Sequence, residues 1–212
     1  ASTVNTRTVN TMLSLLDQQQ DFALWSKTLQ NLASVVPSLI EQGDVALADR
    51  VFADLASREA RTTQPWPGLA EQMREAFGRA TSAAAMSALL GAVLENPDHV
   101  AAAESILKRV DQAAQQRFVA AALDQRQHGG LEAAERLLGR RLVGLLVTLA
   151  AEVQWFQAGS IALRLSHETD LHSRDALIAL ARRPDERSRQ EVAKALAESS
   201  SAIGVSVLAE LL

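Results

Sequence analysis

The stretch PDERSRQEVAKALAESSSAIGVSVLAELL, residues 184–212, carries two helical patterns separated by a run of three serines. In the first pattern, Val192, Ala195 and Leu196 recur at spacings of three and four residues, which places them on one face of a helix. The Pro-Asp pair that precedes it is a turn signal, and the serines are suited to a turn and an N-cap. The stretch therefore predicts two helices joined by a short turn, an αα-hairpin.

The same pattern of helix and short break extends over the rest of the chain, and no segment alternates with the period of two that is typical of a strand. The prediction is therefore an all-α fold. The proline at position 37 marks a kink or a break, and residues 131–151 form either one helix or two, with Gly139 and Gly144 as weak points. The other expected helices are Thr8–Gln20, Phe22–Gln42, Val45–Ala60, Leu69–Arg79, Ser82–Glu95, His99–Val110, Gln112–Gln127, Val153–Ser166 and Leu171–Arg182.

The composition agrees with helices that pack closely. Hydrophobic residues make up 48% of the 212 residues, but aromatic residues only 4%, and tyrosine is absent. Alanine loses no side-chain entropy in a helix, whereas sheets rely on β-branched and aromatic cross-strand pairs. Each helix pair has one apolar stripe that it cannot bury alone, so stacking of neighbouring pairs is needed to form a continuous core. We therefore expect an α-solenoid.

The C-terminal third resembles a HEAT repeat, a member of the armadillo-like solenoids. The residues that carry the resemblance are Pro184, Asp185, Arg187, Arg189, Val192, Ala193, Ala195, Leu196, Val207, Leu208 and Leu211. Ser188 stands where such repeats usually have valine. Residues 155–166 resemble the preceding unit, with Gly159-Ser160 in place of an Arg-Asn pair. The resemblance implies a right-handed superhelix of stacked antiparallel helix pairs, and residues 38–60 faintly resemble a tetratricopeptide unit.

The clearest break in the chain is the loop of residues 61–68, because two prolines and a glycine there disfavour regular structure. We predict a divergent N-terminal helical cap over residues 1–60 and HEAT-like repeats over residues 69–212, in one continuous array. The HEAT character is clearest over residues 153–212. Because the first residue is not methionine and the last residues continue an apolar helix, we expect the chain to be a fragment of a longer one.

Charge and cysteine content argue against several classes of function. The net charge is −4, with both signs scattered along the chain, which does not favour nucleic acid or anionic lipid as a partner. The absence of cysteine excludes disulfides and thiolate metal sites. The longest apolar stretch, Leu142–Ala151, is far shorter than the roughly 20 residues that cross a bilayer. We therefore expect no membrane association and a cytoplasmic location.

The sequence contains no convincing catalytic or metal-binding pattern. His167 and His172 lie five residues apart, about 140° around a helix, so a solvated loop fits them better than zinc. His128 suits the end of a helix, where its charge complements the helix dipole. The serines at 199–201 fit a turn and N-cap better than a nucleophile. We expect no enzyme activity, no metal and no cofactor.

Six residues are candidates for contacting a partner: Trp66, Trp155, Arg182, Arg183, Arg187 and Arg189. Trp66, which follows a proline and precedes another, is either an exposed anchor or a cover for the apolar end of a subdomain. The arginines either form local ion pairs with neighbouring acids or present a contact for a small anion or an acidic peptide.

These patterns predict a non-catalytic scaffold that binds another protein, or a neighbouring domain of the same chain, within a larger bacterial signalling or assembly protein. An alternative is a HEAT-like enzyme, or a module that binds nucleic acid or another ligand through an Arg/Trp groove. That alternative requires an acid, a tryptophan and an arginine to converge, and Trp155 and Arg164 are the residues that would test it. A third possibility is a homo-oligomer that forms through exposed solenoid ends.

Overall fold

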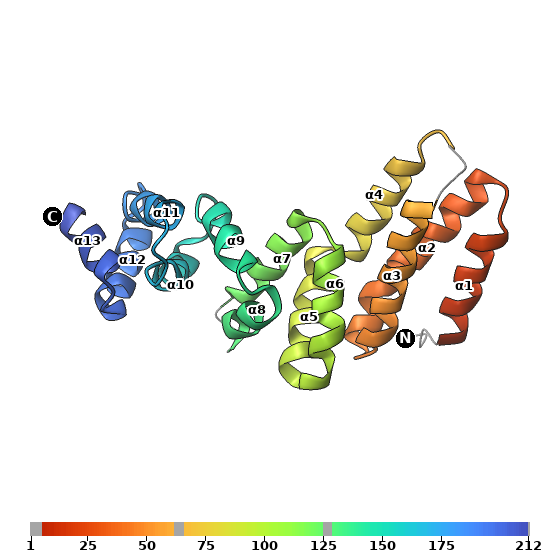
Figure 1. The fold of residues 1–212 in the computed structure, drawn as a ribbon, viewed down its shortest axis with the longest axis horizontal. Helices are drawn as coiled ribbons and strands as arrows, with labels where there is room; N and C mark the ends of the chain where they lie inside the picture. The colour runs from red at the N-terminus through yellow and green to blue at the C-terminus, as the bar shows by residue number, and fades with distance from the viewer. Residues whose placement is uncertain (1–5, 62–65, 125–128, 212) are drawn as a thin grey trace. The chain divides into compact units, whose positions relative to one another are not determined.

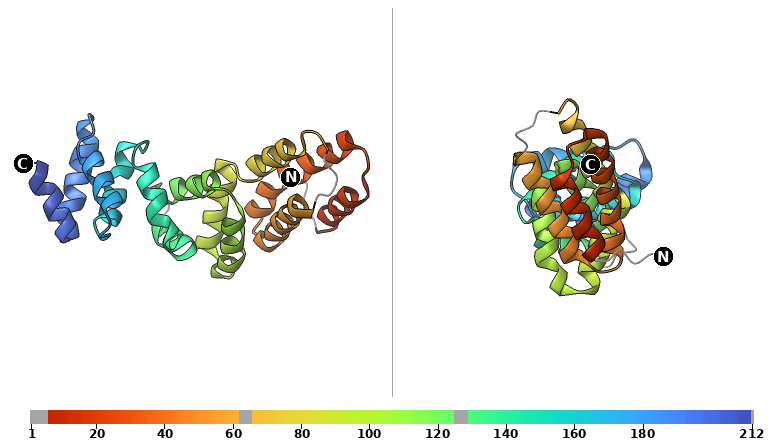
Figure 2. Two further views of the ribbon diagram at one scale, coloured as in Figure 1. Left: turned by 45° about the horizontal axis from the view of Figure 1, so that its top comes forward. Right: turned by 90° about the vertical axis from the view of Figure 1, so that its right-hand side faces the viewer.

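The computed structural model of the chain describes residues 6–61, 66–124 and 129–211. In these ranges the chain is built of α-helices and one short 3-10 helix, with no strand, so the all-α prediction is confirmed (Figures 1 and 2). The elements are α1 Thr6–Gln18, α2 Phe22–Glu41, α3 Val45–Arg61, α4 Leu69–Ala80, α5 Ala83–Glu95, η1 Pro97–His99, α6 Val100–Arg109, α7 Gln112–Ala122, α8 Gly130–Leu138, α9 Arg141–Leu149, α10 Trp155–Leu165, α11 Leu171–Ala181, α12 Glu186–Ser199 and α13 Ala202–Leu211.

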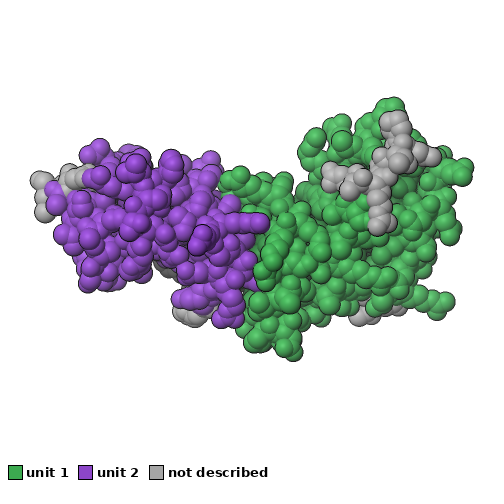
Figure 3. Space-filling view, viewed as in Figure 1, with its two compact units in different colours: residues 1–118 green, residues 119–212 purple. Residues whose placement is uncertain are grey.

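The chain forms two compact units, residues 1–118 and residues 119–212, which are coloured separately in Figure 3. They are called unit 1 and unit 2 below. The boundary between them falls within α7, and the loop that the sequence marks as a break lies inside unit 1. These units are defined by contacts in space and not by repeats in the sequence. The predicted division into a cap of residues 1–60 and repeats of residues 69–212 therefore stays a prediction.

The core of unit 1 is organised around α2, which packs against α1, α3, α4 and α5. Its buried residues recur at spacings of three and four, and Asp21 caps its start by accepting hydrogen bonds from the backbone N–H groups of Ala23 and Leu24. The helix continues through Pro37, so of the kink or break expected there, the break is excluded. Val36, Leu39 and Ile40 flank the proline and are buried, and their packing offsets the hydrogen bond that it cannot donate.

In unit 1, an arginine connects helices α1 and α3. Arg58 of α3 donates to the carboxylate of Asp17 at 2.7 Å and to the carbonyl oxygen of Leu13 at 3.2 Å, both on α1, and it also pairs with Asp54 on its own helix. Burial alone would lower the pKa of Arg58, but its bonds to the two aspartates outweigh that effect and raise the pKa above its ordinary value.

Unit 2 is built from helices that pack against their next and next-but-one neighbours. Thus α11 contacts α9, α10, α12 and α13, and α12 contacts α10 and α13. Trp155 of α10 meets Arg187 of α12, and one turn further on a Cβ at Gly159 would lie 3.2 Å from the carbonyl oxygen of Glu191. Because the contacts follow the same order along both helices, α10 and α12 run parallel, with α11 between them in sequence.

The structure decides one helix boundary in this region that the sequence leaves open, and it ends another helix earlier than the sequence predicts. Residues 131–151 form two helices, α8 and α9, which separate at Gly139, where φ is +53°, and not at Gly144, which lies inside α9. A positive φ disfavours side-chain-bearing residues, so glycine suits this turn. The helix expected over Gln112–Gln127 ends at Ala122, and the end of that segment lies outside the described residues.

No single helix among the described residues is long and apolar enough to cross a membrane. Helices α4 and α5 reach that length and hydropathy together, but they meet at an angle of 49°. Both helices pack against α2, and Met86, Leu89 and Leu90 of α5 are fully buried in the core of unit 1.

Candidate functional site

Trp155, Arg182, Arg183, Arg187 and Arg189 lie at the start of α10 and around the turn between α11 and α12. These five residues are called the Trp155 edge below. Helix α10 begins at Trp155 because Gln154 and Gln157 form a capping box, in which the backbone N–H of Gln154 donates to the Gln157 side chain at 3.2 Å. Helix α12 begins after Asp185, whose carboxylate accepts from the backbone N–H of Ser188 at 2.7 Å.

The two helix starts bring an aromatic ring and a guanidinium together. The Cζ atom of Arg187 lies 5.6 Å from the ring centroid of Trp155, within the range of a cation–π interaction. The indole of Trp155 also meets the ring of Phe156 edge-to-face, with centroids 5.8 Å apart. Trp155 nevertheless remains 41% exposed. The edge therefore presents a large aromatic surface that is held in place by a cation.

The other arginines of the edge differ in how many hydrogen bonds and ion pairs they form within the protein. Arg189 donates from one nitrogen to the carbonyl oxygens of Arg183 and Pro184, each at 2.9 Å, and so closes the turn after α11. Arg183 pairs with Asp185 at 3.4 Å, while its buried Nη1 finds no acceptor among the described residues. Arg182, at the end of α11, is exposed. Local pairing thus accounts for Arg189 and in part for Arg183, but not for Arg187.

Asp185 serves this turn as an ionised cap. Its pKa lies below the ordinary value mainly because the backbone N–H of Ser188 donates to the carboxylate, with a smaller contribution from the charge of Arg183. The negative charge at residue 185 is therefore already engaged by the protein itself. The charges of the turn that remain available to a partner are mainly positive.

Unit 2 also contains a cleft of about 690 Å³ between α8 and α10. Its walls combine small apolar side chains with acids, an arginine and a histidine. The lining residues are Ala122, Leu123, Asp124, Gly129, Gly130, Leu131, Glu132, Glu135, Ser160, Leu163, Arg164 and His167.

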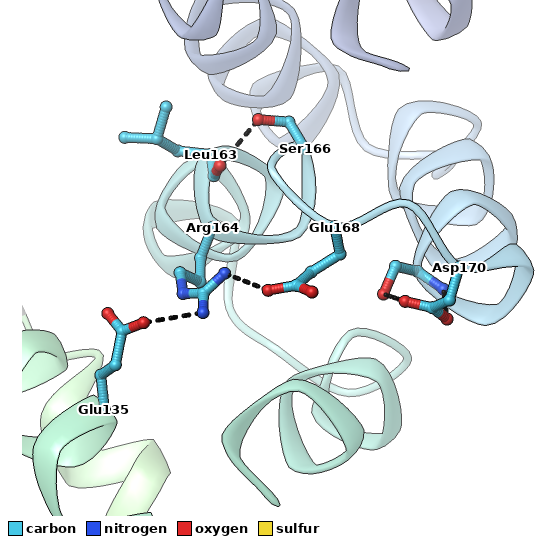
Figure 4. A network of polar contacts seen from close by, with 7 residues as sticks. Glu135, Leu163, Arg164, Ser166, Glu168 and Asp170 are labelled. Carbon is cyan, nitrogen blue, oxygen red and sulfur yellow. Dashed lines mark hydrogen bonds and ion pairs between the residues drawn. The ribbon is translucent and has the colours of Figure 1, made fainter. Parts of the chain in front are cut away.

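Arg164 is the central charge of this cleft. Figure 4 shows its guanidinium between two carboxylates, with Glu168 at 2.5 Å on the segment after α10 and Glu135 at 2.8 Å on α8. Burial alone would lower the pKa of Arg164, but the hydrogen bond to Glu168 and the charges of both glutamates raise it above its ordinary value. The arginine therefore stays charged and ties α8 to α10.

Sequence reasoning singled out Arg164 but neither of its partners. Glu168 is four residues further on, a spacing that by itself signals an ion pair on one helix face. Glu135 lies on a different helix, and no pattern in the sequence links it to Arg164. The cleft brings acid and arginine together, as the Arg/Trp groove requires, but Trp155 is not among its lining residues.

The remaining sequence candidates lie elsewhere. Trp66, in unit 1, packs on Phe22 and Trp25, with ring centroids 5.3 and 5.5 Å apart, so it covers an aromatic cluster and is half-buried. Its role as a partner contact stays a prediction. In unit 2, His167 lines the cleft. His128 lies outside the described residues.

The described residues contain no group of three or more histidines, aspartates or glutamates arranged to hold a metal ion. Asp170, which lies between His167 and His172, caps α11 through the backbone N–H of Ser173. Ser201 accepts a hydrogen bond from the backbone N–H of Gly204 at 2.9 Å, as expected of an N-cap for the last helix.

No protein-family model matches the chain, and no curated protein and no solved structure is found to be similar to it. Any function must therefore be argued from the residues of this chain.

Proposed function

We propose that the chain is a non-catalytic helical-repeat module that binds another protein through the Trp155 edge. In this proposal the module belongs to a larger signalling or assembly protein of a bacterium and acts in the cytoplasm. The observation that carries the proposal is the exposed indole of Trp155, held against Arg187 by two parallel helices. Tryptophan and arginine are the residues most enriched at the energetic centres of protein interfaces.

The packing of unit 2 supports a repeat architecture. The two contacts between α10 and α12 each join residues 32 positions apart, from 155 to 187 and from 159 to 191. Parallel helices with one helix between them in sequence are what stacking of two-helix units produces. The offset is closer to the roughly 34 residues of a tetratricopeptide unit than to the 40–47 of HEAT repeats. The HEAT-like assignment therefore rests on the Pro-Asp turn and the alanine-leucine stripe of α12. In this assignment the preceding unit, which contains α10, is shorter than a full HEAT repeat.

A photo-crosslinking experiment tests this function. A photoreactive amino acid would be placed at position 155, at position 187, or at the exposed control position Arg140, which lies outside the Trp155 edge. Irradiation in the cells of origin should give the same crosslinked protein from positions 155 and 187, and not from position 140. Identical crosslinks from all three positions, or none from 155 and 187, would contradict the proposal.

The cleft at Arg164 supports a second candidate, a ligand-binding module. Its volume suits a small molecule, and charged and apolar groups line it together. A thermal-shift screen of small molecules separates the two candidates. A compound that raises the melting temperature of the wild type and of Trp155→Ala, but not of Arg164→Ala, would support binding at the cleft instead of the edge.

A further inference from the structure

We propose that the Trp155 edge binds an acidic peptide segment of its partner, whose carboxylates pair with Arg187 and Arg182 while apolar atoms lie against the indole of Trp155. This inference rests on the proposed function and specifies the chemistry of the partner. It follows from which charges around the α11–α12 turn are already engaged and which are not.

Arg187 is the arginine best prepared for such a contact. It lies over Trp155 and makes no ion pair with any of the described residues. A guanidinium is weakly hydrated and planar, so it can rest against an aromatic face and still donate two parallel hydrogen bonds to a carboxylate. Because the ring already restrains the side chain, less rotamer entropy is lost when a carboxylate binds.

The acids of the turn do not compete for this position. Residues 182–191 contain four arginines and three acids, and no ion pair joins any of these acids to Arg187. Asp185 is held as the cap of α12 and pairs with Arg183, and Glu186 accepts a hydrogen bond from Gln190 at 3.0 Å. The turn thus carries an excess of positive charge in a chain whose net charge is −4. A negatively charged segment is therefore the complementary partner.

A peptide fits these observations better than a nucleic acid. Single strands bind where bases stack on open aromatic faces along a basic groove. Here Arg187 occupies one face of the indole. The other arginines of the turn do not form a groove, since Arg189 is used by backbone carbonyls and Arg183 by Asp185. The carboxylates of a peptide, in contrast, can bind to individual guanidinium groups and do not require a continuous basic groove.

Fluorescence anisotropy with a short fluorescein-labelled peptide of repeated Asp-Glu tests the proposal. Arg187→Ala should weaken binding about tenfold, which corresponds to about 1.4 kcal/mol. Arg187→Lys keeps the charge but not the planar fork, so it should lose part of the affinity. The matched control is Arg140→Ala, which removes one exposed positive charge elsewhere in unit 2 and should change the affinity less than twofold, a difference of about 0.4 kcal/mol. Affinity should also fall with added salt.

Two outcomes would overturn the acidic-peptide proposal. One is that the wild-type protein does not bind the peptide, or that Arg187→Ala and Arg140→Ala bind it equally strongly. The other is single-stranded oligo(dT) that binds more tightly than the peptide and depends on Arg187, which would assign the edge to nucleic acid. In the first case, a protein crosslinked from positions 155 and 187 in cells would still support the proposed function, so the two failures can be told apart. Circular dichroism confirms that each variant is folded.

Discussion

Gly159 determines how closely α10 and α12 approach in unit 2. A Cβ at this position would lie 3.2 Å from the backbone oxygen of Glu191, whereas a Cβ at Gly144 in α9 would meet no atom within 4 Å. Replacing glycine by alanine inside a helix normally stabilises it by about 1 kcal/mol. We therefore predict that Gly144→Ala raises the free energy of unfolding by about 0.5–1 kcal/mol, whereas Gly159→Ala gains nothing or loses stability. Urea unfolding followed by circular dichroism measures both changes.

The same pair of variants checks the geometry of the Trp155 edge. If α10 is pushed away from α12, Gly159→Ala should also shift the emission of Trp155, measured with Trp25 and Trp66 replaced by phenylalanine. Gly144→Ala should leave the emission unchanged. Equal stabilisation by both alanines would show that the helices do not meet closely at Gly159.

Asp170 gives unit 2 a stability that depends on pH. Its carboxylate accepts from the hydroxyl and the backbone N–H of Ser173, at 2.6 and 3.0 Å, and these bonds hold its pKa below the ordinary value. Since the folded pKa is lower than the unfolded one, the stabilisation is present above the unfolded pKa, about 3.9, and is lost as pH falls through the folded pKa.

The measurement is thermal unfolding at several pH values. At neutral pH, Asp170→Ala should cost about 1 kcal/mol, because the cap of α11 is lost. The difference from wild type should shrink as the pH falls below about 4. Asp170→Asn is the control, since it retains the acceptor and should show a weaker pH dependence. A cost of Asp170→Ala that stays constant down to low pH would contradict the ionised cap.

Among the elements, α8 and α10 are connected by Arg164, and its two ion pairs should not be equal in strength. Glu168 is closer to the guanidinium than Glu135, and its side chain is 29% exposed compared with 52%. Solvent screens the more exposed pair more strongly. We predict that Glu168→Gln costs about 1 kcal/mol and Glu135→Gln about 0.5 kcal/mol or less. Double-mutant cycles with Arg164→Ala measure the two coupling energies, and a larger coupling for Glu135 would reverse this order.

Helices and their ends could largely be predicted from sequence, because apolar periodicity and capping residues are local. Asp170, Asp185 and Ser201 begin helices as their residue types indicate. Whether the helix expected over Phe22–Gln42 breaks at Pro37 could not be decided from the sequence, since that depends on burial of the surrounding residues against other helices. The choice between Gly139 and Gly144 as a break likewise depends on backbone conformation.

The candidate site, too, could be predicted from the sequence only in part, because it depends on how helices pack against one another. The arginines and Trp155 were identified by residue type, but the contact of Trp155 with Arg187 depends on parallel helices whose register no local pattern specifies. The replacement of an Arg-Asn pair by Gly159-Ser160 counted only as a departure from the HEAT pattern. In the structure, this glycine permits the close approach that brings Trp155 to Arg187.

At the scale of the whole molecule, the two compact units have different cores. The buried aromatic side chains Trp25, Phe52 and Phe118 belong to unit 1, whereas the two aromatics of unit 2, Trp155 and Phe156, are exposed or half-buried. Aromatic side chains bury about 150–250 Å² each and contribute strongly to core stability. Unit 2 relies instead on alanine, leucine and valine. We therefore predict that unit 2 unfolds at a lower urea concentration than unit 1.

The tryptophans report on the two units separately. Trp155→Phe leaves Trp25 and Trp66 as probes of unit 1, and the double replacement of Trp25 and Trp66 by phenylalanine leaves Trp155 as the probe of unit 2. The fluorescence midpoint of Trp155 should lie at the lower urea concentration, and circular dichroism should follow both transitions. Because removing Trp25 also weakens unit 1, the circular-dichroism curve of the wild type serves as the reference. Coincident midpoints for all probes would show instead that the two units unfold as one cooperative structure.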